Sequence, residues 1–221
     1  MLASALALTF VVTISNNKPV IVNEVTNFVS TKSTQASPKV EPSQNLIASN
    51  TCQEPAKSAK AAVVGVTHYR YPEASASNLV KVDGQRLDRS AASAFLKMRN
   101  AAWSEQKIKL TVISGFRSIQ EQTTIVNNKR SKGMSDKVIY NASSEPGYSE
   151  HHTGYAMDIN SLEPSFGKTK EGKWLKNNVT RFGFEISFPE SRPNGVSYEP
   201  WHIRYVAKNP QMFCYASKLI R

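Results

Sequence analysis

The chain has 221 residues, enough for one domain with a hydrophobic core and a tail but too few for two full domains. Its 28 Lys and Arg residues exceed its 17 Asp and Glu residues, and the formal net charge of +11 favours an anionic polymer or surface as a neighbour. No basic run is interleaved with stacking aromatic residues, so we expect no nucleic-acid partner.

The chain begins with an uncharged apolar run at residues 2–14, LASALALTFVVTI. This run is shorter than the roughly 20 residues of an ordinary membrane span but suits the apolar part of an export signal. It has no basic residue before it and no clean small-x-small site after it, so either the chain starts further upstream or the run stays as an uncleaved membrane anchor. We therefore expect an exported protein of the periplasm or cell envelope; the alternative is a buried strand or helix of the folded domain.

Residues 15–62 are rich in Ser, Thr, Asn, Gln, Pro and Lys and show no sustained period of 2 or 3.6. This composition predicts a low-complexity tether, followed by a single domain over residues 63–221. Cys52 lies at the end of the tether and Cys214 near the C-terminus. An oxidising compartment would allow a disulfide between them, and two unrelated thiols are the alternative.

The first half of the domain predicts two helices separated by a strand. Asp88 is the expected N-cap of a helix that Trp103 closes, with apolar residues at spacings of three and four: Ala91, Ala94, Phe95, Met98 and Ala102. Residues 107–114 alternate as a strand, which ends at Gly115. Ser118 and Glu121 form a capping-box pattern that opens a helix to about residue 132. Arg117 thus lies on a strand-to-helix turn, where rigid elements often present functional side chains.

The second half predicts a strand at residues 155–160, with Ala156 and Asp158 on the same face. A helix at residues 174–182 and a strand at 184–188 follow. A last strand at 202–206 is entered through Pro200, which cannot donate to a sheet ladder. Because the elements lack a regular β-α-β rhythm, we predict an α+β fold with a small, mainly antiparallel sheet flanked by helices.

Three of the four histidines lie in two short segments, residues 149–158 (SEHHTGYAMD) and 199–202 (EPWH). Catalytic zinc takes three protein ligands and keeps a fourth position open for water, and His151, Asp158 and His202 supply such a set. Glu199 is then the candidate general base. Arg117 offers a fixed positive charge to a carbonyl oxygen that becomes an oxyanion. The alternative is that the acids are ordinary solvated residues and the histidines satisfied core residues.

Other residues near these segments have less specific interpretations. We do not assign His152 to the metal, because adjacent residues of an extended segment point to opposite sides, and we expect it in a groove or at the surface. His68 is expected to be structural or solvent-facing. Trp201 fits a wall of the metal pocket and a core position equally well. Arg204 could meet a substrate carboxylate, but pairing with a local acid is the favoured alternative.

Three blocks of the chain resemble those of the VanY-type D-alanyl-D-alanine carboxypeptidases: SGFRSIQEQ at 114–122, SEHHTGYAMD at 149–158 and EPWHIRYV at 199–206. These are zinc peptidases with the fold shared by the hedgehog signalling domain and lysostaphin-type enzymes. The resemblance covers about residues 67–206, and His152 stands where Gln is usual. It implies His151, Asp158 and His202 as zinc ligands, Glu199 as catalytic base and Arg117 as oxyanion partner, with Gln122 and Ser149 along the substrate groove.

The function implied by the resemblance is zinc-dependent removal of the C-terminal D-alanine from peptidoglycan stem peptides. We expect the protein to be a monomer. Two alternatives within the same fold are an L,D-carboxypeptidase and a peptidoglycan endopeptidase. A non-catalytic wall-binding module is disfavoured because Glu199 and Arg117 are both present. The blocks do not determine which amide bond is cut, because specificity depends on residues that line the pocket.

Overall fold

The computed structural model describes residues 54–191, 195–208 and 212–213. The predicted export segment, most of the predicted tether, and both Cys52 and Cys214 lie outside these residues. None of the helices in the described ranges has the length and apolar character that a membrane crossing requires.

A four-stranded sheet in the order β3-β4-β6-β5 forms the centre of the domain. Its strands are β3 (Val112–Ser114), β4 (Ala156–Ile159), β5 (Phe184–Phe188) and β6 (Glu199–Tyr205). All three pairings are antiparallel, so the predicted α+β fold with a small antiparallel sheet is confirmed. The sheet positions the site because its two central strands carry Asp158 and His202 opposite each other.

The strand predicted at 107–114 is much shorter than expected. Ile108 and Leu110 are buried in the core, but only β3 joins the ladder. The reason is Asn160, whose left-handed backbone (φ 60°) ends the neighbouring strand and whose side-chain Oδ1 accepts from the Thr111 N–H at 2.8 Å. A side-chain amide thus replaces the next ladder bond, which alternation of apolar residues cannot reveal.

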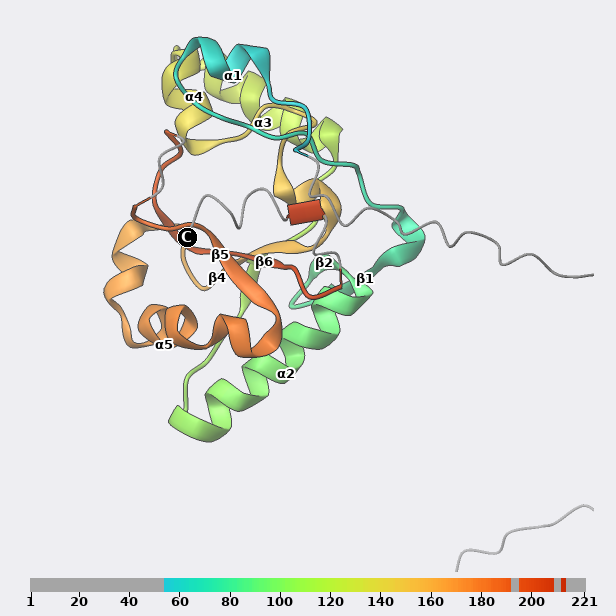
Figure 1. Ribbon diagram of the computed structural model, residues 1–221, viewed down its shortest axis with the longest axis vertical. Coiled ribbons are helices and arrows are strands. Elements are labelled where there is room, and N and C mark those ends of the chain that lie inside the picture. Colours follow the sequence, from blue (N-terminus) through green and yellow to red (C-terminus); the bar gives the residue numbers. More distant parts are fainter. Residues whose placement is uncertain (1–53, 192–194, 209–211, 214–221) are drawn as a thin grey trace, which may run out of the picture. The chain divides into compact units, whose positions relative to one another are not determined.

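One face of the sheet packs against α2 (Arg89–Gln106) and α5 (Lys170–Asn178), which Figure 1 shows together below the sheet. Asp88 caps α2 as predicted, its carboxylate accepting from the Ser90 N–H at 2.8 Å. The predicted helix at 174–182 is α5 followed by a 3₁₀ helix, η4 (Val179–Phe182). The main core lies between these helices and the sheet, and includes Phe95, Met98, Met157, Ile159, Trp174, Leu175, Phe184 and Ile203.

A second helical group contains α1 (Ala59–Val63), α3 (Ile119–Ser131) and α4 (Asp136–Ala142), which lie together at the top of Figure 1. Its small apolar cluster consists of Ala61, Val66, Val126, Ile139 and Tyr140. The capping box of Ser118 and Glu121 at the start of α3 is present as predicted. Helix α4 lies in a polar stretch where we expected none, since seven residues are too few to display an apolar period.

The first helix lies within the range assigned to the tether. Residues 59–62 belong to α1, and Ala61 is fully buried in the cluster with Val126 and Ile139. Lys57 also forms an antiparallel bridge with Tyr69. The folded region therefore includes residues on the N-terminal side of position 63.

A hairpin of β1 (Leu79–Val82) and β2 (Gln85–Asp88) precedes α2 and was not predicted. Its turn residues Asp83 and Gly84 both have positive φ angles, 51° and 81°, as the two-residue turns that match strand twist require. The Asp-Gly dipeptide after Val82 was the available signal. The hairpin matters for the site because the Asp88 N–H donates to the carbonyl of Gly154 at 2.9 Å.

Candidate active site

The first histidine of the doublet is presented by a short 3₁₀ helix, η2 (Glu150–Thr153). Ser149 caps this helix, and its Oγ accepts from the His151 N–H at 3.3 Å. Gly154 then turns the chain into β4 in the left-handed conformation (φ 71°). A Cβ there would lie 2.9 Å from Leu79 Cδ2 and 3.0 Å from the backbone N of Asp88, so only glycine fits both the angle and the space.

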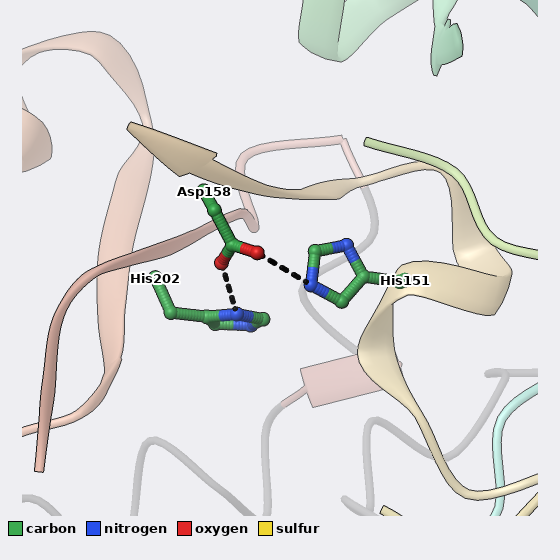
Figure 2. A group of neighbouring side chains, drawn as sticks. All are labelled: His151, Asp158 and His202. Atoms are coloured by element: carbon green, nitrogen blue, oxygen red, sulfur yellow. Dashed lines mark hydrogen bonds and ion pairs between the residues drawn. The ribbon is translucent and has the colours of Figure 1, made fainter. Parts of the chain in front are cut away.

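The other two candidate ligands come from neighbouring strands. Asp158 of β4 and His202 of β6 are register partners, so their side chains leave the same face of the sheet. Asp158 Oδ1 lies 2.9 Å from His202 Nδ1, and its Oδ2 lies 3.4 Å from His151 Nε2. Figure 2 shows the carboxylate between the two imidazole rings, each facing it through one nitrogen. The two rings are perpendicular, with centroids 4.8 Å apart.

This arrangement fits a zinc ion by the chemistry of its donors. One ligand atom from each of His151, Asp158 and His202 lies within 4.8 Å of the other two. The second nitrogen of each ring is occupied: His151 Nδ1 donates to the Gly115 carbonyl at 2.7 Å, and His202 Nε2 donates to Glu150 Oε2 at 3.1 Å. Such outer contacts orient the rings and turn the other nitrogen of each ring toward Asp158 at the centre. Burial lowers the pKa of His151, which favours the neutral form that binds metal.

Glu150 belongs to a buried charge network behind His202. Its side chain is 4% exposed, and it accepts hydrogen bonds from Tyr71 Oη (3.2 Å), Ser187 Oγ (2.5 Å) and Arg204 Nη1 (2.6 Å). Burial alone would raise the pKa of Glu150, but the charge of Arg204 and the hydrogen bond from His202 hold it well below its usual value. Glu150 therefore remains an acceptor for His202, and the alternative in which it is a solvated acid is wrong.

Arg204 is fully buried on β6 and binds both Glu150 and Glu185, the latter at 3.1 Å. The favoured alternative for this residue, pairing with an acid, is thus what the structure shows. However, the main partner lies 54 residues away in the sequence. No spacing pattern connects the two residues, which is why sequence reasoning missed the role of Glu150.

Glu199 is the first residue of β6, and its Oε2 lies 3.8 Å from His202 Nδ1. Its side chain is 17% exposed. Burial raises the pKa of Glu199 to about 7, against the lowering effect of the His202 charge, while the negative charges of Asp158 and Glu150 raise it further. A carboxyl group with a pKa near neutrality is suited to accept a proton and to return it.

Arg117 is fixed by contacts on its side chain and on its backbone. Its Nη1 donates to Gln122 Oε1 at 2.8 Å and its Nη2 to Ser114 Oγ at 3.2 Å. The Arg117 N–H donates to the carbonyl of His151 at 3.1 Å, and the Arg117 carbonyl accepts from His152 Nδ1 at 2.7 Å. The arginine turn is therefore tied directly to the histidine doublet.

These contacts also place His152. Its Nε2 accepts from the Gly147 N–H at 3.0 Å, so both ring nitrogens bond to backbone and neither faces the metal ligands. His152 thus lies apart from the three candidate ligands, and it is fully buried instead of lying in a groove or at the surface as we expected. His68 is structural: it is buried, and its Nε2 lies 2.8 Å from the Tyr140 carbonyl.

A cavity of about 420 Å³ opens over the candidate ligands and reaches from the sheet to α3 and α4. Ser149, Trp201, Arg117 and Glu199 all line it, together with the three candidate ligands. Trp201 also belongs to the main core, so both interpretations of this residue hold. Gln122 is fully buried and is not among the lining residues, so it acts on the cavity through Arg117.

Comparisons with known proteins agree with this geometry. Residues 84–208, more than half of the chain, match the VanY family, described as D-alanyl-D-alanine carboxypeptidase. YodJ of Bacillus subtilis (strain 168), which is named as a carboxypeptidase, is 37% identical over 146 residues, which cover 62% of this chain and 52% of YodJ. The chain spans about half the length of the curated relatives that it matches, with 52%, 37% and 50% covered in three of them.

Two solved structures share the fold. The LD-carboxypeptidase LdcB superposes with a TM-score of 0.57 at 32% identity, over 67% of this chain and 76% of LdcB. A glutamate-to-alanine mutant of the D,D-pentapeptidase VanY from a VanB-type resistance cassette, in complex with Zn(II), gives a TM-score of 0.54 at 26% identity, over 72% of this chain and 98% of that one. On the family match, and with the three sequence blocks assembled around one cavity, this chain belongs to the VanY family of D-alanyl-D-alanine carboxypeptidases.

Proposed function

We propose that this chain is a zinc-dependent carboxypeptidase that removes the C-terminal D-alanine from peptidoglycan stem peptides. The observation that carries the proposal is the convergence of a His-Asp-His donor set, a buried carboxyl group with a pKa of about 7, and an anchored arginine on one cavity. Each of these groups has a role in the hydrolysis of an amide.

His151, Asp158 and His202 would hold the zinc ion. When bound, zinc supplies a Lewis acid that polarises a carbonyl group and lowers the pKa of water. Glu199 accepts the proton of the attacking water and later delivers it to the nitrogen of the departing D-alanine. The guanidinium of Arg117 donates to the carbonyl oxygen as negative charge develops there, a contribution of about 3 kcal/mol for one well-placed donor.

A second candidate function is L,D-carboxypeptidase activity, since the superposition with LdcB is supported by 32% identity. Endopeptidase activity within the same stem is a third. The experiment is digestion of defined tri-, tetra- and pentapeptide stems, with and without a chelator, followed by mass spectrometry. Loss of one alanine from the pentapeptide alone supports D,D cleavage, and loss from the tetrapeptide supports L,D cleavage. If only internal bonds or cross-links are cut, the carboxypeptidase proposal fails.

The role of Glu199 has its own test. The variant Glu199→Ala is expected to bind zinc with unchanged stoichiometry and to lose kcat by a factor on the order of 10²–10⁴, the usual contribution of a general acid–base group. Metal content by mass spectrometry and turnover on the preferred stem peptide are the two measurements. Unchanged turnover in this variant would contradict the mechanism.

We also propose that the protein is exported and acts at the cell envelope as a monomer. The apolar run at residues 2–14 and the formal net charge of +11 support this location, because the cell wall is an anionic polymer. Fractionation of cells that express the full chain, with gel filtration of the purified protein, tests both statements. Recovery of the protein in the cytoplasmic fraction would overturn the first, and a stable dimer the second.

A further inference from the structure

One side of α3 faces the cavity and carries a lysine that the mechanism does not use. Gln122, Ile125, Val126 and Lys129 recur at spacings of three and four and so share one face of the helix. Gln122 holds Arg117, Val126 is buried in the second apolar cluster, and Ile125 and Lys129 line the cavity. The Lys129 ammonium donates a hydrogen bond to Ser143 Oγ, from the segment that follows α4. Lys129 is thus half-buried and held at the cavity wall.

The charge of Lys129 is poorly balanced within the described part of the chain. No carboxylate of a described residue lies within 4.0 Å of its Nζ. Burial lowers the pKa of Lys129, and the positive charge of Arg117 lowers it further, while Glu199 has the opposite, smaller effect. Two partly desolvated cations that line the same cavity repel each other. An anion bound between them offsets this repulsion and stabilises both charges.

The substrate of a carboxypeptidase brings such an anion. Its free carboxylate belongs to the residue that leaves, whose Cα is about 3.8 Å from that of the preceding residue. The group that recognises it must therefore lie in the same cavity as Arg117 and Glu199. Among the described lining residues, Arg117 and Lys129 are the arginine and the lysine. Arg117 is already bound to Ser114 and Gln122.

His68, which also lines the cavity, does not supply this charge. Its Nδ1 accepts from the Glu145 N–H at 3.3 Å while its Nε2 donates to the Tyr140 carbonyl at 2.8 Å, so both ring nitrogens are already engaged by backbone groups. Lys129 therefore remains as the cation of this cavity that is available to bind the substrate carboxylate.

We propose that Lys129, together with the hydroxyl of Ser143, binds the free C-terminal carboxylate of the peptide and so restricts cleavage to the last residue. This proposal rests on the proposed carboxypeptidase function and names the residue that sets its exo-specificity. An ammonium group that donates to a carboxylate forms a charge-assisted hydrogen bond, the stronger class of such bonds. A peptide whose terminus carries no charge gains nothing from Lys129.

The test compares two peptides that differ only at the C-terminus, one ending in D-alanine and the other in D-alaninamide. Wild type is expected to prefer the free acid. The variant Lys129→Met should lower kcat/KM for the acid at least tenfold and leave that for the amide within a factor of two. Lys129→Arg should restore part of the preference. Lys132→Met removes one exposed positive charge from the end of the same helix and should change neither substrate.

Equal loss on both peptides, or no loss on either, would overturn the role of Lys129. To separate this outcome from failure of the proposed function, the two peptides are also titrated by calorimetry into zinc-loaded Glu199→Gln protein, which requires no turnover. There Lys129→Met should weaken binding of the acid at least tenfold and leave the amide unchanged. If this selective loss occurs while wild type cleaves no stem peptide, the carboxylate site stands and the hydrolytic function falls.

Discussion

The two sides of the cavity are built differently. On the sheet side, Asp158, Glu199 and His202 project from strands whose far face packs on the main core, and a buried Glu150–Arg204 pair lies behind the ligands. On the helical side, Arg117 lies on the turn just before α3 and Lys129 near the C-terminal end of α3, which rests on a cluster of five buried apolar residues. Two of the candidate metal ligands, Asp158 and His202, are thus held by strand register and buried charge, and the cationic groups rest on a much smaller core.

This difference indicates that the two sides of the cavity have different functions. Metal ligands must be positioned to within a few tenths of an ångström. Strand register, together with the hydrogen bonds on the side of each ligand that faces away from the metal, provides this precision. A short helical group with few buried apolar contacts belongs to the less stable part of a domain. Substitutions there lower the free energy of unfolding of the whole domain less. We therefore expect changes on the sheet side to affect zinc binding and stability, and changes on the helical side to affect rate and specificity.

The largest expected effect comes from removing a ligand. Asp158→Asn should reduce zinc content to near zero after dialysis and lower kcat/KM by at least about four orders of magnitude, because the amide carries no charge for the ion. Metal analysis and the stem-peptide assay measure both. Retained zinc with retained activity would remove Asp158 from the donor set.

Breaking the pair behind His202 comes next. Arg204→Met removes the permanent positive charge that balances Glu150 in the buried network, which costs about 3–5 kcal/mol and should lower Tm by about 10 °C. Zinc affinity should fall about 10–100-fold, because the acceptor of His202 is disturbed. The matched control is Arg181→Met, which breaks the exposed pair with Glu105 and should change neither quantity measurably. Equal effects in both variants would contradict the role assigned to burial.

On the helical side, Arg117→Met should lower kcat by about 10²–10³, the range for loss of one oxyanion donor. Zinc content and Tm should stay close to those of wild type, because the guanidinium donates its hydrogen bonds to Ser114 and Gln122 and to none of the candidate metal ligands. Isothermal titration with zinc is the discriminating measurement. Loss of zinc in this variant would mean that the helical side also contributes to metal binding, which would contradict the proposed difference between the two sides.

The smallest effect concerns pH and the metal-free protein. The pKa of Glu199 is raised to about 7 and that of His202 to about 10, so each of these two groups binds its proton more tightly in the folded state than in the unfolded state. Burial lowers the pKa values of His151 and His152, which act in the opposite direction below about pH 6.5. Stability without zinc should therefore fall as pH rises from about 6.5 to 10, where His202 dominates. The contribution of Glu199, on the order of 3 kcal/mol, should be lost between about pH 4.5 and 7, so the difference in stability between wild type and Glu199→Gln should shrink over that interval. Thermal melts in chelator at several pH values check this, and a rise in stability with pH above about pH 6.5 would contradict it.

Sequence reasoning located most elements that have caps or long apolar periods. Helix α2 follows from Asp88 and its apolar stripe, and α3 from the capping box of Ser118 and Glu121. It missed α4 and the β1-β2 hairpin, because seven- and four-residue elements offer too few positions for a period. It also made β3 too long, since the side chain of Asn160 ends the ladder by a bond that no apolar pattern records.

The sequence alone determined which donor types are available, because His151, Asp158 and His202 are residue types that bind metal and stand in spaced blocks. It also indicated Glu199, in the same block as His202, and Arg117, in a separate block at 114–122. Only the tertiary structure decided which residues surround these groups. Glu150 pairs with Arg204, which is 54 residues away in the sequence, and Lys129 lines the cavity because of the way α3 packs. Such contacts depend on how separate elements pack, and local spacing along the chain carries no record of that packing.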